Sequence, residues 1–238
     1  MKPFDIGKVS QKILLGLHIE TSFENECPST NRSAKEQAPG VEAPLKVYLT
    51  NHQTAGRGRN LNVWSNSSPG TSFLSSWSFS FSRNPQPILS PLVGLAIYTN
   101  LTECFSGLNF SLKAPNDILL GGEKLCGILV ENILIGNQGR CIIGIGLNVF
   151  DAPKNLRATS LIQHTLITER DWQKFLTSLH FDLIECMLAA ESNRLETQTC
   201  QQLAEALRRN PSLQDELLEV TPDGSLVFKS KKLDWQSL

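Results

Sequence analysis

The stretch from residue 72 to residue 81 has the most regular pattern of hydrophobic and polar positions in the chain. Phe73, Trp77, Phe79 and Phe81 stand an even number of positions apart, with small polar residues between them. Successive side chains of a β-strand point to opposite faces of its sheet, so this spacing predicts a strand. One face would be aromatic and buried. The other face would be accessible and lined by serines, namely Ser72, Ser76, Ser78 and Ser80.

Other short hydrophobic segments, separated by turn residues, predict further strands. These segments are residues 47–49, 112–120, 125–131 and 141–148, and residues 136–139 are expected to form a turn. Gly121 and Gly122 supply the positive φ angles of a hairpin turn. Gly144 and Gly146, inside the last of these strands, indicate the close approach of another backbone or of a ligand.

Apolar residues recur at helical spacing in three places. Ser90 and Pro91 open the first helix, and Thr168 to Asp171 resembles a capping box that opens the second. The third helix runs from Cys200 to Arg209, and a hairpin is predicted over residues 217–228. Strands joined by hairpins, with helices added, are typical of an α+β fold.

A polar triplet, Ser29-Thr30-Asn31, precedes a short segment that favours a helix. Serine, threonine and asparagine are common N-cap residues, so plain helix capping is the first interpretation of the triplet. A binding role is the alternative. The sequence of this segment taken alone favours capping.

Composition narrows the possible classes of protein. The chain has 238 residues, of which 40% are hydrophobic and 19% charged, with a formal net charge of -1. This is enough to bury a core in one main domain, and it lacks the basic surface of a nucleic-acid binder. No apolar run reaches the ~20 residues that cross a bilayer, and the first residues lack the apolar core of a signal peptide. We therefore expect a cytoplasmic protein.

The six cysteines and four histidines are scattered, and no Cys-x-x-Cys pair occurs. We expect reduced thiols, no zinc site and histidines that are structural or exposed. Near the N-terminus the sequence shows only a short apolar patch, Ile13–Leu17.

Residues 53–64 form a loop in which Gly56 and Gly58 are each followed by an arginine, Arg57 and Arg59. Glycine permits close approach of a ligand, and the arginine guanidinium binds phosphate or carboxylate through a planar fork of donors. The loop is thus a candidate anion cradle. Glycine–arginine repeats also occur in nucleic-acid-binding tails and in solvated loops, so the loop alone is weak evidence.

Five motifs taken in order resemble those of the biotin protein ligases, and the resemblance extends from roughly residue 12 to residue 190. They are Ser29-Thr30-Asn31, the 53–59 loop with Trp64, Lys113-Ala114-Pro115-Asn116-Asp117, residues 124–131, and residues 144–148. The resemblance implies a mixed β-sheet with flanking helices, similar to class II aminoacyl-tRNA synthetases and typical of the biotin–lipoate ligase fold. The catalytic domain would span residues 1–210. A reduced β appendage would span residues 211–238, and the type would be monofunctional, without an N-terminal DNA-binding domain.

The resemblance implies an enzyme that activates biotin with ATP and Mg²⁺ to biotinyl-5'-AMP. It would then transfer biotin to a lysine of a biotin carboxyl-carrier protein. Lys124, Arg57 and Lys113 would be the catalytic residues, because fixed cations offset the repulsion between a carboxylate and the α-phosphate that it attacks. The residues that match biotin contacts are Ser29, Thr30, Asn31, Gln53, Gly56, Arg57, Lys124 and Gly127. Those that match ATP and adenylate contacts are Gly58, Arg59, Trp64, Asn116 and Asn148.

Two further roles follow from the resemblance. Asp117 would hold Mg²⁺ or the loop, and a plain turn-capping role for it is equally favoured. The glycine–arginine loop would fold over the adenylate and exclude water.

The sequence departs from the family pattern at three places. Ala114 stands where the family usually has tryptophan, which changes the wall of the acyl pocket. Asn60-Leu61-Asn62 replaces a more basic continuation of the loop, and the C-terminal domain is short. A lipoate or octanoate ligase or transferase of the same fold, and a non-catalytic biotin-binding protein, are therefore alternatives. The protein would be a monomer or a homodimer, with no nucleic-acid or membrane partner.

Overall fold

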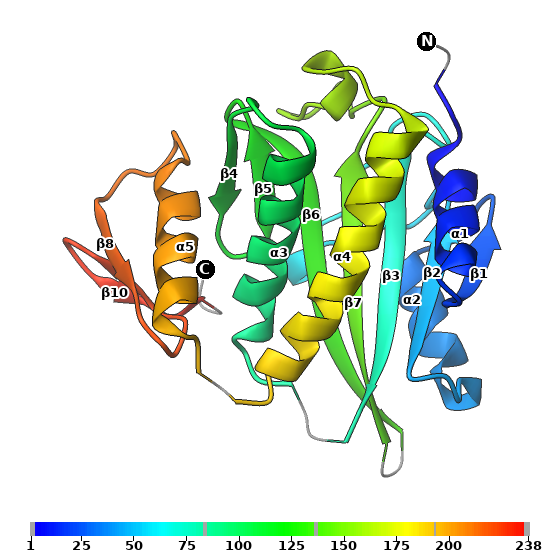
Figure 1. The fold of residues 1–238 in the computed structure, drawn as a ribbon, viewed down its shortest axis with the longest axis horizontal. Helices are drawn as coiled ribbons and strands as arrows, with labels where there is room; N and C mark the ends of the chain where they lie inside the picture. Colours follow the sequence, from blue (N-terminus) through cyan, green and yellow to red (C-terminus); the bar gives the residue numbers. More distant parts are fainter. Residues whose placement is uncertain (1–2, 83–84, 136–137, 193, 236–238) are drawn as a thin grey trace. The chain divides into compact units, whose positions relative to one another are not determined.

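A computed structural model describes residues 3–82, 85–135, 138–192 and 194–235 of the chain, which divides into two compact units (Figure 1). Unit 1 comprises Met1–Asn84 and Leu125–Thr177, and unit 2 comprises Pro85–Lys124 and Ser178–Leu238. Each unit is described by itself. The predicted domain boundary at residue 210 is a separate division of the chain and stays a prediction.

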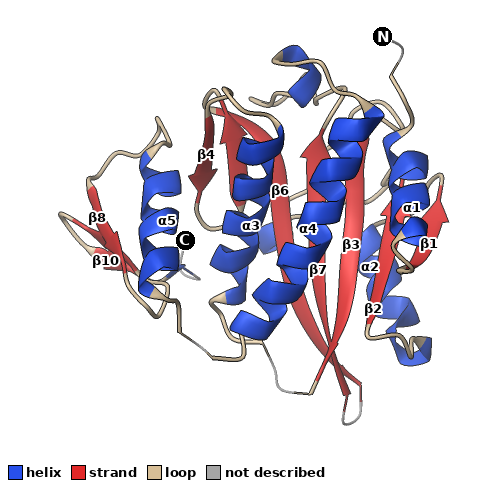
Figure 2. Ribbon diagram, viewed as in Figure 1, coloured by secondary structure: helices blue, strands red, loops and turns tan. Residues whose placement is uncertain are grey.

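Unit 1 is built on a mixed sheet whose strands follow the order β1-β2-β3-β7-β6 (Figure 2). The strands are β1 (Glu20–Glu24), β2 (Leu45–Thr50), β3 (Ser72–Phe81), β7 (Gln138–Asn148) and β6 (Glu123–Ile135), whose first two residues belong to unit 2. β1 and β2 are parallel, and the other neighbours are antiparallel. The predicted mixed sheet is confirmed. Of the predicted turn at 136–139, residues 136 and 137 lie outside the described residues.

The two faces of this sheet differ in residue type as the alternation along residues 72–81 predicts. The expectation that the polar face is accessible is wrong along most of the strand, because Ser72, Ser76 and Ser78 are at most 3% exposed. Trp77 stands between Val47 and Ile143 in the register, and all three side chains are fully buried. The neighbouring position on β3, Ser76, stands between Tyr48 and Gly144 on the opposite face. We call this second face the serine face. It carries Ser76, Ser78 and Ser80 of β3, Arg140, Ile142, Gly144 and Gly146 of β7, and Gly127, Leu129 and Glu131 of β6.

Helices pack on both faces of the unit 1 sheet (Figure 2). They are α1 (Ile6–Gly16), α2 (Thr30–Gln37) and the first part of α4 (Glu169–Ala189), with the short 3₁₀ turns η1 (Ala38–Gly40), η2 (Arg59–Leu61) and η3 (Leu161–Gln163). On the aromatic face, the Trp172 ring of α4 lies 5.3 Å from that of Phe73 and its Nε1 donates to Ser10 Oγ of α1 at 2.9 Å. On the serine face, Ala34 of α2 packs against Tyr48 and Ile142.

The predicted start of α4 is confirmed. Asp171 N donates to Thr168 Oγ1 at 3.2 Å, and Thr168 N donates to Asp171 Oδ2 at 3.0 Å. These two bonds satisfy donors that the first helical turn leaves unpaired, which is the function of a capping box.

Unit 2 combines helices with an antiparallel strand pair and a C-terminal antiparallel sheet. α3 (Leu89–Cys104) precedes the pair β4 (Phe110–Lys113) and β5 (Asp117–Leu120). The end of α4 leads to α5 (Thr197–Arg208), and the C-terminal sheet has the order β10-β9-β8. Its strands are β8 (Leu217–Val220), β9 (Leu226–Phe228) and β10 (Lys232–Leu233). Gly121, Gly122 and Gly224 have positive φ angles, as expected of the turns in which they were predicted.

Two elements of unit 1 were not predicted. α1 begins after Asp5, whose carboxylate accepts a hydrogen bond from Lys8 N at 2.9 Å, and β1 forms the edge of the sheet. No helix in the described part of the chain is both long and apolar enough to cross a membrane.

Candidate binding site on the serine face

The N-terminus of α2 is anchored by long-range hydrogen bonds. Ser29 occupies the N-cap position but its side chain makes no capping bond, so plain capping, the first interpretation of the triplet, is wrong. Thr30 N donates instead to Gln53 Oε1 at 2.9 Å, and Thr30 Oγ1 lies 2.7 Å from Ser76 Oγ. All four residues are more than nine-tenths buried. The binding interpretation of the triplet therefore gains support.

Asn31 extends this cluster to β6. Its Oδ1 accepts from Ser76 Oγ at 2.5 Å, and its Nδ2 donates to Glu131 Oε2 at 2.8 Å. The other carboxylate oxygen of Glu131 lies 2.5 Å from Lys35 Nζ. A Cβ at Gly144 would lie 2.2 Å from Asn31 Oδ1, so only glycine leaves room for this amide.

The glycine–arginine loop folds back on itself beside this cluster. Trp64 N donates to Gly56 O at 3.0 Å, Gly58 N donates to Asn62 O at 2.7 Å, and Arg57 and Val63 form a β-bridge. A Cβ at Gly56 would lie 2.8 Å from Trp64 O, which explains the glycine there. Arg57 is exposed and Arg59 half-buried, so the Arg57 guanidinium can meet an anion without a large desolvation cost.

The ring of Trp64 lies over Gly146 of β7, where an added Cβ would approach ring atom Cζ2 to 2.6 Å. Next along the same face of β7 is Asn148, which is 2% exposed. Its Nδ2 donates to Thr159 O at 3.1 Å, while its Oδ1 has no hydrogen-bond partner among the described residues. A buried acceptor without a donor is costly, so a ligand hydroxyl or amine fits there.

Unit 2 holds a second group of the predicted residues. Lys124 Nζ lies 2.7 Å from Asp117 Oδ1, and Lys113 stands opposite Asp117 in the β4–β5 register. Asn116 occupies the turn between these two strands. Trp235, which follows β10 and is buried, donates from Nε1 to Pro115 O of this turn at 2.8 Å.

The residues predicted for a metal do not form a cluster. No group of three or more histidine, cysteine or acidic side chains that could hold a metal occurs in the described ranges. The Asp117 carboxylate is paired with a lysine.

Sequence reasoning assigned no individual role to Ser76, Glu131 and Lys35. Ser76 and Glu131 hold Asn31, and Lys35 pairs with Glu131, whereas Gly144 and Gly146 make room for Asn31 and Trp64. The glycines carried a usable signal, because close approach of a backbone or ligand was expected there.

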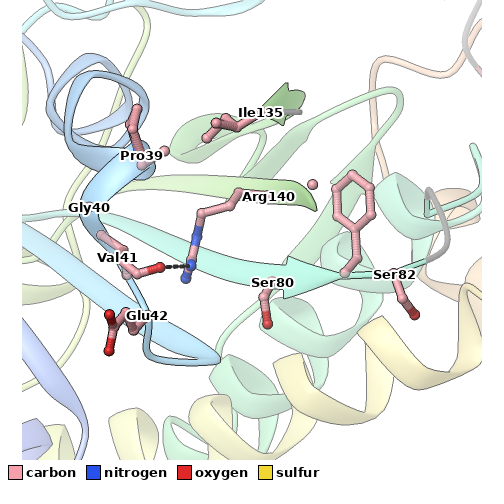
Figure 3. Close-up of a pocket in the computed structure, with 11 residues that line it drawn as sticks. Pro39, Gly40, Val41, Glu42, Ser80, Ser82, Ile135 and Arg140 are labelled. Carbon is pink, nitrogen blue, oxygen red and sulfur yellow. Dashed lines mark hydrogen bonds between the residues drawn. The ribbon is translucent and has the colours of Figure 1, made fainter. Parts of the chain in front are cut away.

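A pocket of about 630 Å³ lies at the far end of β3 and β7 and contains none of the predicted site residues (Figure 3). Its floor is Arg140, whose guanidinium donates to Val41 O at 3.0 Å, Ala43 O at 2.9 Å and Ser78 O at 2.8 Å. Burial lowers the pKa of this guanidinium. Main-chain carbonyls thus take up most of its donors, and the residue ties segments together.

Comparison with known proteins shows which family the chain is related to. Residues 26–148, slightly more than half of the chain, match the Biotin/lipoate A/B protein ligase family. The Bifunctional ligase/repressor BirA of Bacillus subtilis is 34% identical over 174 residues, which cover 66% of this chain and 52% of that protein. The Biotin--[acetyl-CoA-carboxylase] ligase of Paracoccus denitrificans is 35% identical over 130 residues, covering 52% of each chain. The chain spans about half the length of these curated relatives.

Solved structures show the same fold. The biotin protein ligase from Aquifex aeolicus in complex with biotin and ATP superposes with a TM-score of 0.67 at 21% identity, covering 90% of this chain and 94% of that one. The ligase from Leishmania major in complex with biotinyl-5-AMP gives 0.63 at 20% identity, covering 90% and 98%. The predicted fold and the predicted resemblance to biotin protein ligases are both confirmed. The chain belongs to the biotin/lipoate A/B protein ligase family.

Proposed function

We propose that the protein is a biotin–protein ligase that activates biotin with MgATP to biotinyl-5'-AMP and transfers biotin to a lysine of a biotin carboxyl-carrier domain. The observation that carries the proposal is the buried cluster of Thr30, Gln53, Ser76 and Asn31 on the serine face. Relatives named as biotin ligases support it. The carrier would belong to acetyl-CoA carboxylase or a related carboxylase.

The cluster suits the ureido ring of biotin, a neutral group with two N–H donors and one carbonyl acceptor. Buried polar side chains that hold one another in place give such a ring fixed partners and reject ligands that cannot pair with them. The proposed biotin contacts are Ser29, Thr30, Asn31, Gln53, Gly56, Arg57, Lys124 and Gly127. Gly127 adds no side chain to this face of the sheet, whereas Gly144 and Gly146 make room for Asn31 and Trp64.

Adenylation needs positive charge, because the biotin carboxylate attacks a negatively charged phosphate and pyrophosphate leaves. Lys124, Arg57 and Lys113 are the proposed catalytic cations. The Asp117 carboxylate, with Oδ1 2.7 Å from Lys124 Nζ, orients the ammonium, and an incoming carboxylate would share the ammonium with it. Gly58, Arg59, Trp64, Asn116 and Asn148 are proposed for ATP and the adenylate, with the Trp64 ring offering a flat apolar surface to the base.

Mg²⁺ would bridge and neutralise the ATP phosphates, with Asp117 as the proposed protein ligand when its pair with Lys124 opens. The glycine–arginine loop, folded as described, would cover the adenylate and limit its hydrolysis by water.

We further propose a cytoplasmic protein without a nucleic-acid partner. The six cysteines form no disulfide, as in most proteins of reducing compartments. A net charge of -1 offers no broad attraction to a polyanion. The protein would act as a monomer or a homodimer.

The test is transfer of labelled biotin to a biotin carboxyl-carrier domain with MgATP, with lipoate and a lipoyl domain in parallel. We expect carrier labelling, and a loss of about 10²-fold or more in Lys124→Ala, as is typical when one fixed charge is removed from a transition state. Lys229→Ala is the matched control, because Lys229 is an exposed lysine of unit 2 that pairs with Glu216 at 3.6 Å.

The other outcomes have distinct meanings. Labelling of the lipoyl domain alone would replace biotin by lipoate as the substrate, and Ala114 would then explain the wider acyl pocket. Binding of biotin without labelling of either carrier would make the chain a binding protein and not a ligase.

A further inference from the structure

Glu131 and Lys35 form an ion pair beside the proposed ureido site, and nothing in the proposed reaction uses them. The Glu131 carboxylate is about three-quarters buried, with Lys35 Nζ at 2.5 Å and Asn31 Nδ2 at 2.8 Å on separate oxygens. A chain of hydrogen bonds runs from this carboxylate into the site. We call it the polar chain; in order its members are Glu131, Asn31, Ser76, Thr30 and Gln53.

We propose that Glu131 is a positioning residue that sets the donor–acceptor direction of the polar chain, so that the site accepts a ligand presenting N–H groups. This inference rests on the proposed function, because it assigns a reason for recognition of the ureido ring.

The first step is the orientation of the Asn31 amide. An ionised carboxylate can only accept hydrogen bonds, so the group facing Glu131 must be the donor Nδ2. The carbonyl of Leu129, at 3.5 Å from the same nitrogen, is also an acceptor only. Asn31 Oδ1 is thereby turned toward Ser76.

The second step concerns two hydroxyl hydrogens. The Ser76 hydroxyl carries one hydrogen, and Asn31 Oδ1, 2.5 Å from Ser76 Oγ, carries none. The Ser76 hydroxyl therefore donates its hydrogen to Asn31 Oδ1. The hydrogen in the 2.7 Å contact between Ser76 Oγ and Thr30 Oγ1 must then come from Thr30, whose other acceptor, Gln53 Oε1, lies farther away at 3.4 Å. The remaining lone pairs of Thr30 Oγ1 are acceptors.

The third step is the end of the polar chain. Gln53 Oε1 accepts the main-chain N–H of Thr30 at 2.9 Å, which leaves the Gln53 amide nitrogen as the donor side of that group. The site thus combines a hydroxyl acceptor with an amide donor. A ureido ring has the complementary N–H and C=O groups, whereas a ligand without N–H groups would leave the acceptor unpaired.

Glu131→Gln tests the proposed direction of the polar chain. The glutamine amide has one acceptor oxygen and one donor NH₂ group, whereas the carboxylate has two acceptor oxygens. Lys35 can only donate, so we expect the new amide oxygen to turn toward Lys35 and its NH₂ group toward Asn31. Asn31 would then flip and present its own NH₂ to Ser76, which reverses the polar chain. We expect the dissociation constant for biotin to rise about 10- to 100-fold, the range typical of one misdirected buried hydrogen bond.

Removing the lysine should restore the original direction. In the double variant Lys35→Met, Glu131→Gln no ammonium competes for the amide oxygen, so that oxygen can again accept from Asn31. We expect the double variant to bind biotin at least about 5-fold more tightly than Glu131→Gln alone. Glu36→Gln is the control for charge loss, since Glu36 pairs with Arg32 on the exposed side of α2 and lies outside the polar chain.

Biotin binding is measured by calorimetry on the full chain, with the ATP KM followed in the transfer assay. A weakened Glu131→Gln with rescue in the double variant and an unchanged ATP KM is the expected result. Equal affinity in all variants, or weakening without rescue, would overturn the inference.

A second readout separates this inference from the proposed function. The side-chain amide signals of Asn31 in a ¹⁵N NMR spectrum report its hydrogen-bond partner without any ligand. We expect these signals to shift in Glu131→Gln and to return in the double variant. If the wild type neither binds nor transfers biotin, the proposed function fails, and unmoved Asn31 signals would separately refute the direction of the polar chain.

Discussion

Two glycines of β7 decide which side chains can lie on the serine face. Asn31 occupies the space above Gly144, and the Trp64 ring occupies the space above Gly146. The two glycines face the same side of β7. In the proposed function Asn31 contacts biotin and Trp64 contacts ATP. Substitution at each should therefore affect a different ligand.

We expect Gly144→Ala to raise the dissociation constant for biotin by about 10-fold or more, because a Cβ at 2.2 Å must displace the Asn31 amide. Gly146→Ala should instead raise the KM for ATP by displacing Trp64. Each should lower the free energy of unfolding by about 1–3 kcal/mol, as overpacking does. Binding calorimetry, ATP kinetics and urea denaturation measure these effects.

Gly94→Ala is the control for the loss of a glycine. It lies inside α3, its added Cβ would meet only Leu112 Cδ2 at 3.6 Å, and a gain of about 0.5–1 kcal/mol in stability is expected. A biotin defect in Gly146→Ala equal to that in Gly144→Ala would contradict this separation of the biotin and ATP contacts.

For individual residues, the sequence predicted some features of the site and missed others. Glycines inside a buried strand were expected to admit a neighbour, and the structure identifies Asn31 and Trp64 as those neighbours. Glu131 and Lys35 could not be assigned in advance, because the contacts that give Glu131 its position span 96 and 100 residues of sequence. Spacing along the chain carries no information on such pairs.

Among the elements, the connection between η1 and β2 is held by the side chain of Arg140 of β7 and by β3, where Ser80 N donates to Pro44 O at 2.8 Å. Arg140 is 4% exposed and holds the carbonyls of Val41 and Ala43 against β3 (Figure 3). No carboxylate lies within ion-pair distance of it in the described part of the chain. The guanidinium therefore stabilises this connection through hydrogen bonds to carbonyl groups.

We expect Arg140→Met to lower the free energy of unfolding by about 2–4 kcal/mol, because it leaves buried carbonyl oxygens without donors. Arg32→Met is the matched control. Its guanidinium pairs with Glu36 on the surface of α2 with a side chain 53% exposed, so a much smaller loss than in Arg140→Met is expected. Urea unfolding followed by circular dichroism compares the two, and equal losses would refute the structural role given to Arg140.

Strong local signals predicted the elements that matched best. The alternation along β3 and the capping box of α4 are each complete within ten residues of sequence. β1 was missed because it forms the sheet edge and Phe23 is the single apolar residue among Glu20–Glu24. α1 was missed because the inward position Ser10 interrupts its apolar stripe, and only the bond from Trp172 of α4 accounts for a buried serine there.

The contact of Trp235 with Pro115 is another feature that the sequence could not predict. It joins residues 120 positions apart and places an indole beside the turn where the family pattern would have a tryptophan at Ala114. The C-terminal segment thus stabilises the turn that carries Asn116 and Asp117.

For the molecule as a whole, burial controls the chemistry of its thiols. Five of the six cysteines are buried and Cys104 is half-buried. Burial raises the pKa of Cys141 and Cys186 to about 12, and it also raises the pKa of Cys27 and Cys200. The thiolate is the reactive form, and its population at pH 8 is small when the pKa lies far above that pH.

We therefore expect native protein at pH 8 to react rapidly with an aromatic disulfide reagent at no more than one thiol, and denatured protein to react at six. Cys104→Ser should remove the rapid reaction and leave five thiols after denaturation. The absorbance of the released thiolate measures both values. Rapid reaction of two or more thiols in folded Cys104→Ser would contradict the burial of the five cysteines that this variant retains.

The alternation along β3 and β7 also bears on how such proteins diverge. Neighbouring residues of these strands face either the aromatic core or the ligand, so a lineage can alter Ser76 or Gly146 while Phe73 and Trp77 remain untouched. Descendants of one ancestor can in this way acquire new substrates and inherit the core unchanged. Substitutions between such related proteins would then be concentrated at every second position of β3 and β7.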